Sequence, residues 1–203
     1  DHAPREIVRG AVDAARRLDG VSKILLVGVE DAVRAELTQL GKIPDKIEVV
    51  HASQVVDMPD KPVEALRRKK DSSIARAVDL VKDGSADAVV SAGNTGAVMV
   101  SATLKLRKLA AVERPAIATV MPTRNRPFVL VDAGANTDCT ATFLAQFAVM
   151  GHVYSQTILG QKSPVVGLLS IGGEEVKGND ITRETFKLLS DSDLNFRGNV
   201  EGH

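Results

Sequence analysis

Hydrophobic and polar positions follow two spacings along the chain. Short apolar or β-branched runs, typical of buried strands, occur at residues 23–28, 47–50, 88–90, 116–120, 128–131 and 164–169. Apolar residues recur at helical spacing in residues 6–18, 31–40, 62–82, 95–110, 141–159 and 181–189. Strands that alternate with helices of this length favour right-handed crossovers and parallel pairing. The pattern predicts an α/β fold, with a doubly wound, mostly parallel sheet and helices on both faces.

Composition and charge exclude several classes of function. Of the 203 residues, 44% are hydrophobic and 26% are charged, which is typical of a soluble globular domain. The formal net charge is zero and only 3% of residues are aromatic, so neither a basic field nor stacking platforms indicate a nucleic-acid partner. No apolar run approaches the ~20 residues of a membrane helix.

The ends and the single cysteine add two expectations. Cys139 has no partner for an internal disulfide, and no Cys/His cluster has metal-ligand spacing, so we expect a cytoplasmic protein without a structural metal. A lone cysteine is most often a small buried hydrophobe, and no covalent nucleophile is assigned. The chain begins with Asp1 rather than Met, and both ends look cut. We therefore interpret residues 1–203 as part of a longer protein.

Three polar, glycine-bearing loops follow predicted strands, at residues 91–97, 131–138 and 171–179. In an open parallel sheet, ligands bind beyond the carboxyl ends of the strands, where loops and helix N-termini meet. The chain contains neither a phosphate-binding G-x-x-x-x-G-K-[ST] motif nor a dinucleotide-binding G-x-G-x-x-G motif. No cofactor is therefore predicted.

The first loop suits either a ligand or a helix cap. Gly93 and Gly96 allow close backbone approach, while Asn94 and Thr95 supply polar side chains at the positive end of a predicted helix. That arrangement favours an oxyanion or phosphate cradle. Asn and Thr also favour an N-cap, so the capping interpretation stays open.

The other two loops carry a carboxylate and a cation. Asp132 and Asn136 follow a strand and could orient a substrate, or could bond their own backbone as turn residues. Lys177 lies among glycines in a loop whose composition is unusual for a simple connector, and it could meet a negative substrate. A solvated lysine is the alternative.

Residues 67–71 form a conspicuous charged run within the predicted helix 62–82. Arg67 and Asp71 have the i, i+4 spacing of a helical ion pair, which favours a solvated face. Arg68, Lys69 and Lys70 remain candidates for contact with phosphate or an acidic partner.

Taken in order, these segments resemble the phosphate acyltransferases of bacterial phospholipid synthesis, the PlsX family. The segments that carry the resemblance span the chain from first residue to last: 1–4, 51–53, 67–73, 91–97, 113–115, 131–136, 150–154, 166–169, 177–179 and 198–202. The family has a fold similar to phosphotransacetylase and to isocitrate dehydrogenase. The resemblance implies transfer of an acyl group from acyl-acyl-carrier protein to inorganic phosphate, which gives acyl phosphate.

The resemblance also implies roles for individual residues. Lys177 and Asn179 match the family's Lys-Gly-Asn loop and are the expected catalytic residues. Substrate or phosphate binding is expected at the residues that match three further motifs, namely Asp1, His2, Gly93, Asn94, Thr95, Gly96, Asp132 and Asn136. Arg68 and Lys69 are the expected contacts for the carrier protein.

The family further implies a homodimer in the cytoplasm that associates peripherally with the membrane, where a glycerol-phosphate acyltransferase takes the product. Compared with the family, the chain lacks the first strand and the C-terminal third, so residues 1–203 are expected to form a partial domain. Ser170 stands where members commonly carry Asn. Two alternatives are a phosphotransacetylase-like enzyme that uses acyl-CoA and a non-catalytic module that docks the carrier protein.

Overall fold

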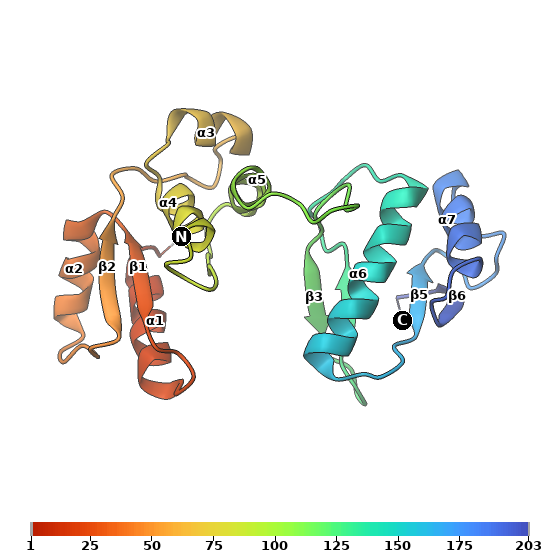
Figure 1. Ribbon diagram of the computed structural model, residues 1–203, viewed down its shortest axis with the longest axis horizontal. Coiled ribbons are helices and arrows are strands. Elements are labelled where there is room, and N and C mark those ends of the chain that lie inside the picture. Colours follow the sequence, from red (N-terminus) through yellow and green to blue (C-terminus); the bar gives the residue numbers. More distant parts are fainter. Residues whose placement is uncertain (1, 203) are drawn as a thin grey trace. The chain divides into compact units, whose positions relative to one another are not determined.

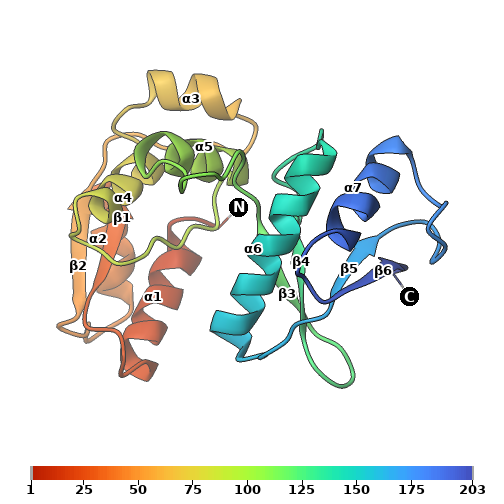
Figure 2. The ribbon, with the colours of Figure 1, turned by 45° about the vertical axis from the view of Figure 1, so that its right-hand side comes forward.

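The computed structural model describes residues 2–202 and divides the chain into two compact units, which meet in sequence between Arg107 and Lys108. The first unit contains α1 (Arg5–Arg17), β1 (Ile24–Gly28), α2 (Glu30–Gln39), β2 (Ile47–His51), α3 (Pro62–Arg68), α4 (Ser73–Lys82) and α5 (Thr95–Lys105). The second contains β3 (Ala118–Met121), β4 (Phe128–Val131), α6 (Ala141–Leu159), β5 (Val166–Leu169), α7 (Asp180–Ser190) and β6 (Phe196–Val200). Figure 1 labels these elements except β4, which Figure 2 labels.

The first unit has two apolar clusters. β1 and β2 pair in parallel, with Ile24 opposite Ile47. The amphipathic faces of α1 and α2 bury Val8, Val12, Val33 and Leu37 against Leu26 of β1. A second cluster joins α3, α4 and α5 through Ala65, Ile74 and Ala97, together with Val56 from the segment that follows β2.

The second unit is built around α6. β3 and β4 form an antiparallel hairpin, with Met121 opposite Phe128, and α6 packs against β4 and α7 (Figure 2). β5 and β6 pair in parallel, and α7 is the crossover between them. A Cβ at Gly151 of α6 would lie 3.3 Å from Cγ2 of Val131, so a small residue allows α6 to approach β4 closely.

The predicted α/β class is confirmed. Among residues 2–202, the strands pair as three two-stranded sheets, of which two are parallel. No helix in this part of the chain is long and apolar enough to cross a bilayer.

Two sequence predictions about elements are wrong. Residues 88–90 form no strand, and Val90 is 97% exposed. An isolated apolar run needs a pairing partner to become a strand, and no described strand pairs with this one. The predicted helix 62–82 is broken, because α3 ends at Arg68 and Ser72 caps a new helix by accepting a hydrogen bond from the Ala75 N–H.

Candidate functional site

Asn94 caps α5 and also holds a distant loop. Its Oδ1 accepts a hydrogen bond from the Ala97 N–H at 3.0 Å, which confirms the capping interpretation. Its Nδ2 lies 3.2, 3.1 and 3.0 Å from the carbonyl oxygens of Asp57, Met58 and Asp60. The side chain is buried, and its donors and its acceptor are all engaged within the fold.

The glycines beside Asn94 have different surroundings. A Cβ at Gly96 would lie 2.5 Å from Cγ of Pro62, so Gly96 lets α3 pack closely on α5. A Cβ at Gly93 would have contacts of 3.4 Å and more, which are ordinary. The N–H groups of Thr95 and Gly96 lie in the first helical turn and have no acceptor within the helix. These two N–H groups and the exposed Thr95 hydroxyl are the donors that this loop can offer to an anion.

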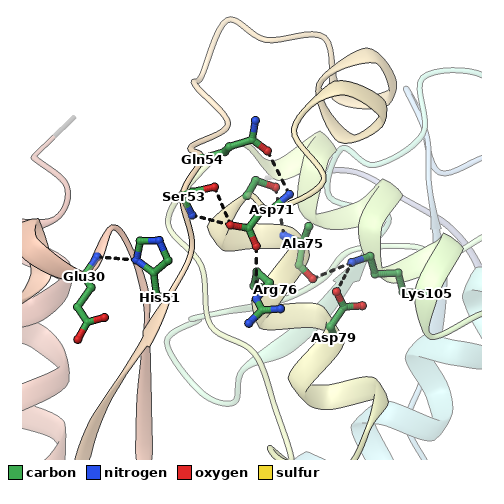
Figure 3. A network of polar contacts seen from close by, with 10 residues as sticks. Glu30, His51, Ser53, Gln54, Asp71, Ala75, Arg76, Asp79 and Lys105 are labelled. Atoms are coloured by element: carbon green, nitrogen blue, oxygen red, sulfur yellow. Dashed lines mark hydrogen bonds and ion pairs between the residues drawn. The ribbon is translucent and has the colours of Figure 1, made fainter.

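Asp71 joins two of the segments that carry the family resemblance. Its Oδ2 accepts hydrogen bonds from the N–H of Ser53 at 2.8 Å and from the hydroxyl of Ser53 at 2.7 Å. The hydroxyl first, and then the N–H, hold the pKa of the Asp71 carboxyl below its usual value. Figure 3 shows Ser53 and Arg76 beside this carboxylate, while the Asp71 backbone N–H donates to Gln54 Oε1, close to the end of β2. The predicted ion pair between Arg67 and Asp71 does not form among the described residues, because Asp71 takes these other partners.

The sequence alone does not predict this network, although Ser53 and Asp71 both lie in segments that carry the family resemblance. At the end of β2, His51 Nδ1 accepts a hydrogen bond from the N–H of Glu30 at 3.3 Å. That contact links the carboxyl ends of β1 and β2, which are adjacent in the sheet. Both sets of contacts join residues far apart in sequence, so only the spacing of the motifs could have suggested them.

Lys69 is engaged within the fold. Its Nζ lies 2.6 Å from Asp60 Oδ2 and 3.1 Å from Asp57 Oδ2. The hydrogen bonds to Asp60 and to Asp57 raise the pKa of Lys69, and the same ammonium is the main cause of the lowered pKa of Asp60. Arg68, beside it, is exposed.

The loop after β4 is organised by Asp132. Its carboxylate accepts hydrogen bonds from the N–H groups of Ile117, Ala135 and Asn136 and from Nδ2 of Asn136. Burial opposes ionisation, but these four donors outweigh it and hold the pKa of Asp132 below its usual value. Asn136 Nδ2 also donates to the carbonyl of Pro115 at 2.9 Å. The loop is therefore a rigid turn with an ionised centre.

The loop after β5 carries Lys177, and other residues of this loop line a cleft. A cleft of about 430 Å³ is lined by residues from the end of β5 and the start of α7, namely Leu169, Ser170, Ile171, Gly178, Asn179 and Thr182. Asn179 caps α7 through Oδ1, which accepts from the Thr182 N–H at 2.9 Å. Gly178 has φ +94°, and a Cβ there would lie 2.0 Å from Thr182 Oγ1. Lys177 is exposed, and among residues 2–202 its ammonium forms no ion pair.

The predicted site residues fall into local groups. Lys177 and Asn179 belong to one loop, and Asp132 and Asn136 to another, while no hydrogen bond among the described residues joins these two loops. The residues from 93 to 96, Arg68, Lys69 and His2 belong to the first unit. His2 is exposed, and its carbonyl accepts from the Glu6 N–H at 3.2 Å. The prediction for Asp1 lies outside the described residues. The binding and catalytic roles expected for these residues stay predictions.

Two solved structures with a similar fold are phosphotransacetylases. A phosphotransacetylase from Streptococcus pyogenes superposes with a TM-score of 0.69 at 22% identity, over 98% of this chain and 66% of that one. The EutD phosphotransacetylase from Staphylococcus aureus gives a TM-score of 0.55 at 17% identity, over 96% of this chain and 73% of that one. The fold is therefore the α/β fold of the phosphotransacetylases.

Comparison of sequences identifies the family, which the similarity of fold does not. The family model described as "Fatty acid synthesis protein" matches residues 1–203, so the chain belongs to this family. Proteins named phosphate acyltransferase are 52% identical in Desulforamulus reducens, over 100% of this chain, and 46% identical in Clostridium botulinum, over 99% of it. The chain spans 60% of the length of each of these relatives.

Proposed function

We propose that the whole protein transfers an acyl group from acyl-acyl-carrier protein to inorganic phosphate. The observation that carries the proposal is identity of 45–52% to proteins named phosphate acyltransferase, within a fatty acid synthesis family. A phosphate oxygen attacks the thioester carbonyl, a C–O bond forms, and the C–S bond breaks. The carrier thiolate leaves and takes a proton from water, and the product is acyl phosphate.

This reaction requires the protein to position phosphate against the thioester carbonyl and to supply positive charge near the reacting atoms. It does not require a covalent nucleophile. Phosphate is already an anion near pH 7, so its approach and the charge that develops on the carbonyl oxygen must be stabilised. The exposed Lys177 ammonium, which no carboxylate neutralises among residues 2–202, suits that role, and Gly178, which follows Lys177, lines the cleft next to α7. Asn179 fixes the start of α7 beside it.

Phosphate binding is proposed at the start of α5 and beside the Asp132 turn. The N–H groups of Thr95 and Gly96 supply donors at a helix N-terminus, and the exposed Thr95 hydroxyl adds a third. Asp132 and Asn136 are proposed to bind substrate or phosphate at the turn after β4, and the same role is proposed for Asp1 and His2 on the family resemblance.

Partners and location follow from the same proposal. Carrier proteins are acidic, and Arg68 offers an exposed cation for docking, whereas Lys69 is partly neutralised by Asp57 and Asp60. We propose a cytoplasmic homodimer that works peripherally at the membrane. A membrane glycerol-phosphate acyltransferase would take the acyl phosphate.

The test measures thiol release from acyl-acyl-carrier protein by the whole protein, with and without phosphate. We expect release to depend on phosphate, and Lys177→Ala to lower kcat roughly 10²–10³-fold, the scale of losing one charge-stabilising donor. Lys187→Ala, on the exposed face of α7, is the matched control and should keep wild-type activity.

Three results would argue against the proposal. Equal release without phosphate would indicate a thioesterase, and faster turnover of acyl-CoA than of the carrier thioester would indicate the phosphotransacetylase reaction. Equal activity of the two lysine variants would remove Lys177 from the mechanism.

A further inference from the structure

The Asn94 side chain connects two segments that lie more than 30 residues apart. Its Nδ2 is within 3.2 Å of the carbonyl oxygens of residues 57, 58 and 60, while its Oδ1 accepts from the Ala97 N–H. A carboxamide has two N–H donors, so these carbonyls share both of them. The loop of residues 57–60 thus wraps around the nitrogen of a side chain that is only 6% exposed.

The same loop is held a second time by Lys69. The ammonium bridges the carboxylates of Asp57 and Asp60, and Asp60 Oδ2 also accepts from the Asp57 N–H at 2.9 Å. Lys69 follows α3 directly, whereas Asn94 precedes α5. The 57–60 loop is therefore fixed to the ends of two different helices by two sets of polar contacts.

A ligand cannot use the Asn94 amide without dismantling this arrangement. An anion that accepted from Nδ2 would displace carbonyl acceptors in a buried environment, where unpaired carbonyls are costly. The neighbouring Thr95 is exposed and its N–H has no acceptor within α5. The polar groups next to Asn94 can face a ligand, but its own side chain faces the protein.

We propose that Asn94 is a positioning residue, which orients the start of α5 for phosphate by locking it to the 57–60 loop, and that Lys69 supports the same lock. This inference rests on the proposed function, because it specifies how the Gly93–Gly96 loop of that site is built. It assigns the carboxamide a role distinct from ligand contact.

The experiment uses Asn94→Ser and Lys69→Met in the whole protein, with Lys23→Ala as control. Serine keeps an oxygen that can cap α5 but lacks the N–H donors to the loop. Lys23 forms an exposed ion pair with Glu48 in the same unit, so its loss removes a surface contact of similar kind. Amide hydrogen exchange over residues 57–60 and the KM for phosphate are measured for each variant.

We expect Asn94→Ser to speed exchange in the 57–60 loop and to raise the phosphate KM about tenfold, the scale of a small displacement of a binding group. Lys69→Met should change both in the same direction. The double variant should raise KM by less than the product of the single effects, because both contacts act on one loop. The control should match the wild type.

Three results would overturn the inference. A raised KM with unchanged exchange would mean that Asn94 contacts phosphate directly. Faster exchange with unchanged KM and kcat would mean that the contacts of Asn94 and Lys69 with the 57–60 loop are only structural. Unchanged exchange together with unchanged KM would mean that these contacts do not hold the loop. Phosphate-independent thiol release by the wild type would instead refute the proposed function, and the exchange measurement would still report on the lock.

Discussion

Substitution of Gly178 by alanine should disable the Lys177 loop through geometry alone. The backbone at Gly178 has φ +94°, a conformation that L side chains rarely adopt, and holding alanine there costs about 1–3 kcal/mol. The new Cβ would lie 2.0 Å from Thr182 Oγ1 and 3.0 Å from Thr182 Cβ, inside the first turn of α7. The 2.0 Å contact cannot be tolerated, so the loop or the helix start must move.

The movement has two measurable consequences. Thr182 donates through its hydroxyl to the Asn179 carbonyl at 2.9 Å and through its N–H to Asn179 Oδ1, so displacing it disturbs the α7 cap. Loss of such a cap costs about 1 kcal/mol. Because Lys177 precedes Gly178, a shift of about 1 Å in the loop should lower kcat by roughly 10²-fold.

Gly173→Ala is the matched control, since it lies in the same loop. A Cβ at Gly173 meets nothing within 4 Å, and its backbone is not in the left-handed region. The assay compares Tm and phosphate-dependent thiol release for the wild type and both variants. Wild-type kcat and Tm in Gly178→Ala, or an equal loss in both variants, would refute the reasoning.

Three further outcomes are expected. Gly172→Ala places a Cβ 2.9 Å from Cγ of Lys177, so it should lower kcat while Tm, measured by calorimetry, stays near the wild-type value. Gly96→Ala places a Cβ 2.5 Å from Cγ of Pro62 and should lower Tm, and it should also raise the phosphate KM. Asp132→Asn should cost about 1–3 kcal/mol near pH 7 in denaturant unfolding, because the carboxylate accepts four hydrogen bonds. Since its pKa is lowered in the folded state, this difference should be full above the ordinary aspartate pKa of about 3.9 and should shrink as pH falls through the lower folded-state value.

The sequence was sufficient to predict helix ends that neighbouring residues determine. The predicted helix 141–159 is observed as Ala141–Leu159, because a long apolar stretch follows a Thr140 cap and precedes Gly160, whose φ is +65°. Asn94 was recognised as a candidate cap for the same reason. In both cases a few neighbouring residues determine where the helix begins.

The sequence was insufficient where contacts between residues far apart in the chain determine the secondary structure. The break at residues 69–72 depends on the segment after β2, because the Ser73 N–H donates to the Gln54 carbonyl at 3.0 Å and the Gln54 N–H donates to the Asp71 carbonyl at 3.2 Å. β6 was missed because Phe196–Val200 contains Arg, Gly and Asn, which do not indicate a strand. Its backbone becomes a strand by pairing with β5.

The candidate site residues also differ in whether their polar atoms are engaged within the fold or exposed to a ligand. The carboxamide of Asn94 and the carboxylate of Asp132 have the sequence signal of ligand-binding groups, but the fold uses their polar atoms to hold backbone N–H and carbonyl groups in place. Lys177 is different, because its charge is exposed and unpaired among residues 2–202. Substitution of the first two should therefore act through the positions of their loops, whereas substitution of Lys177 should remove charge from the reaction without moving the backbone.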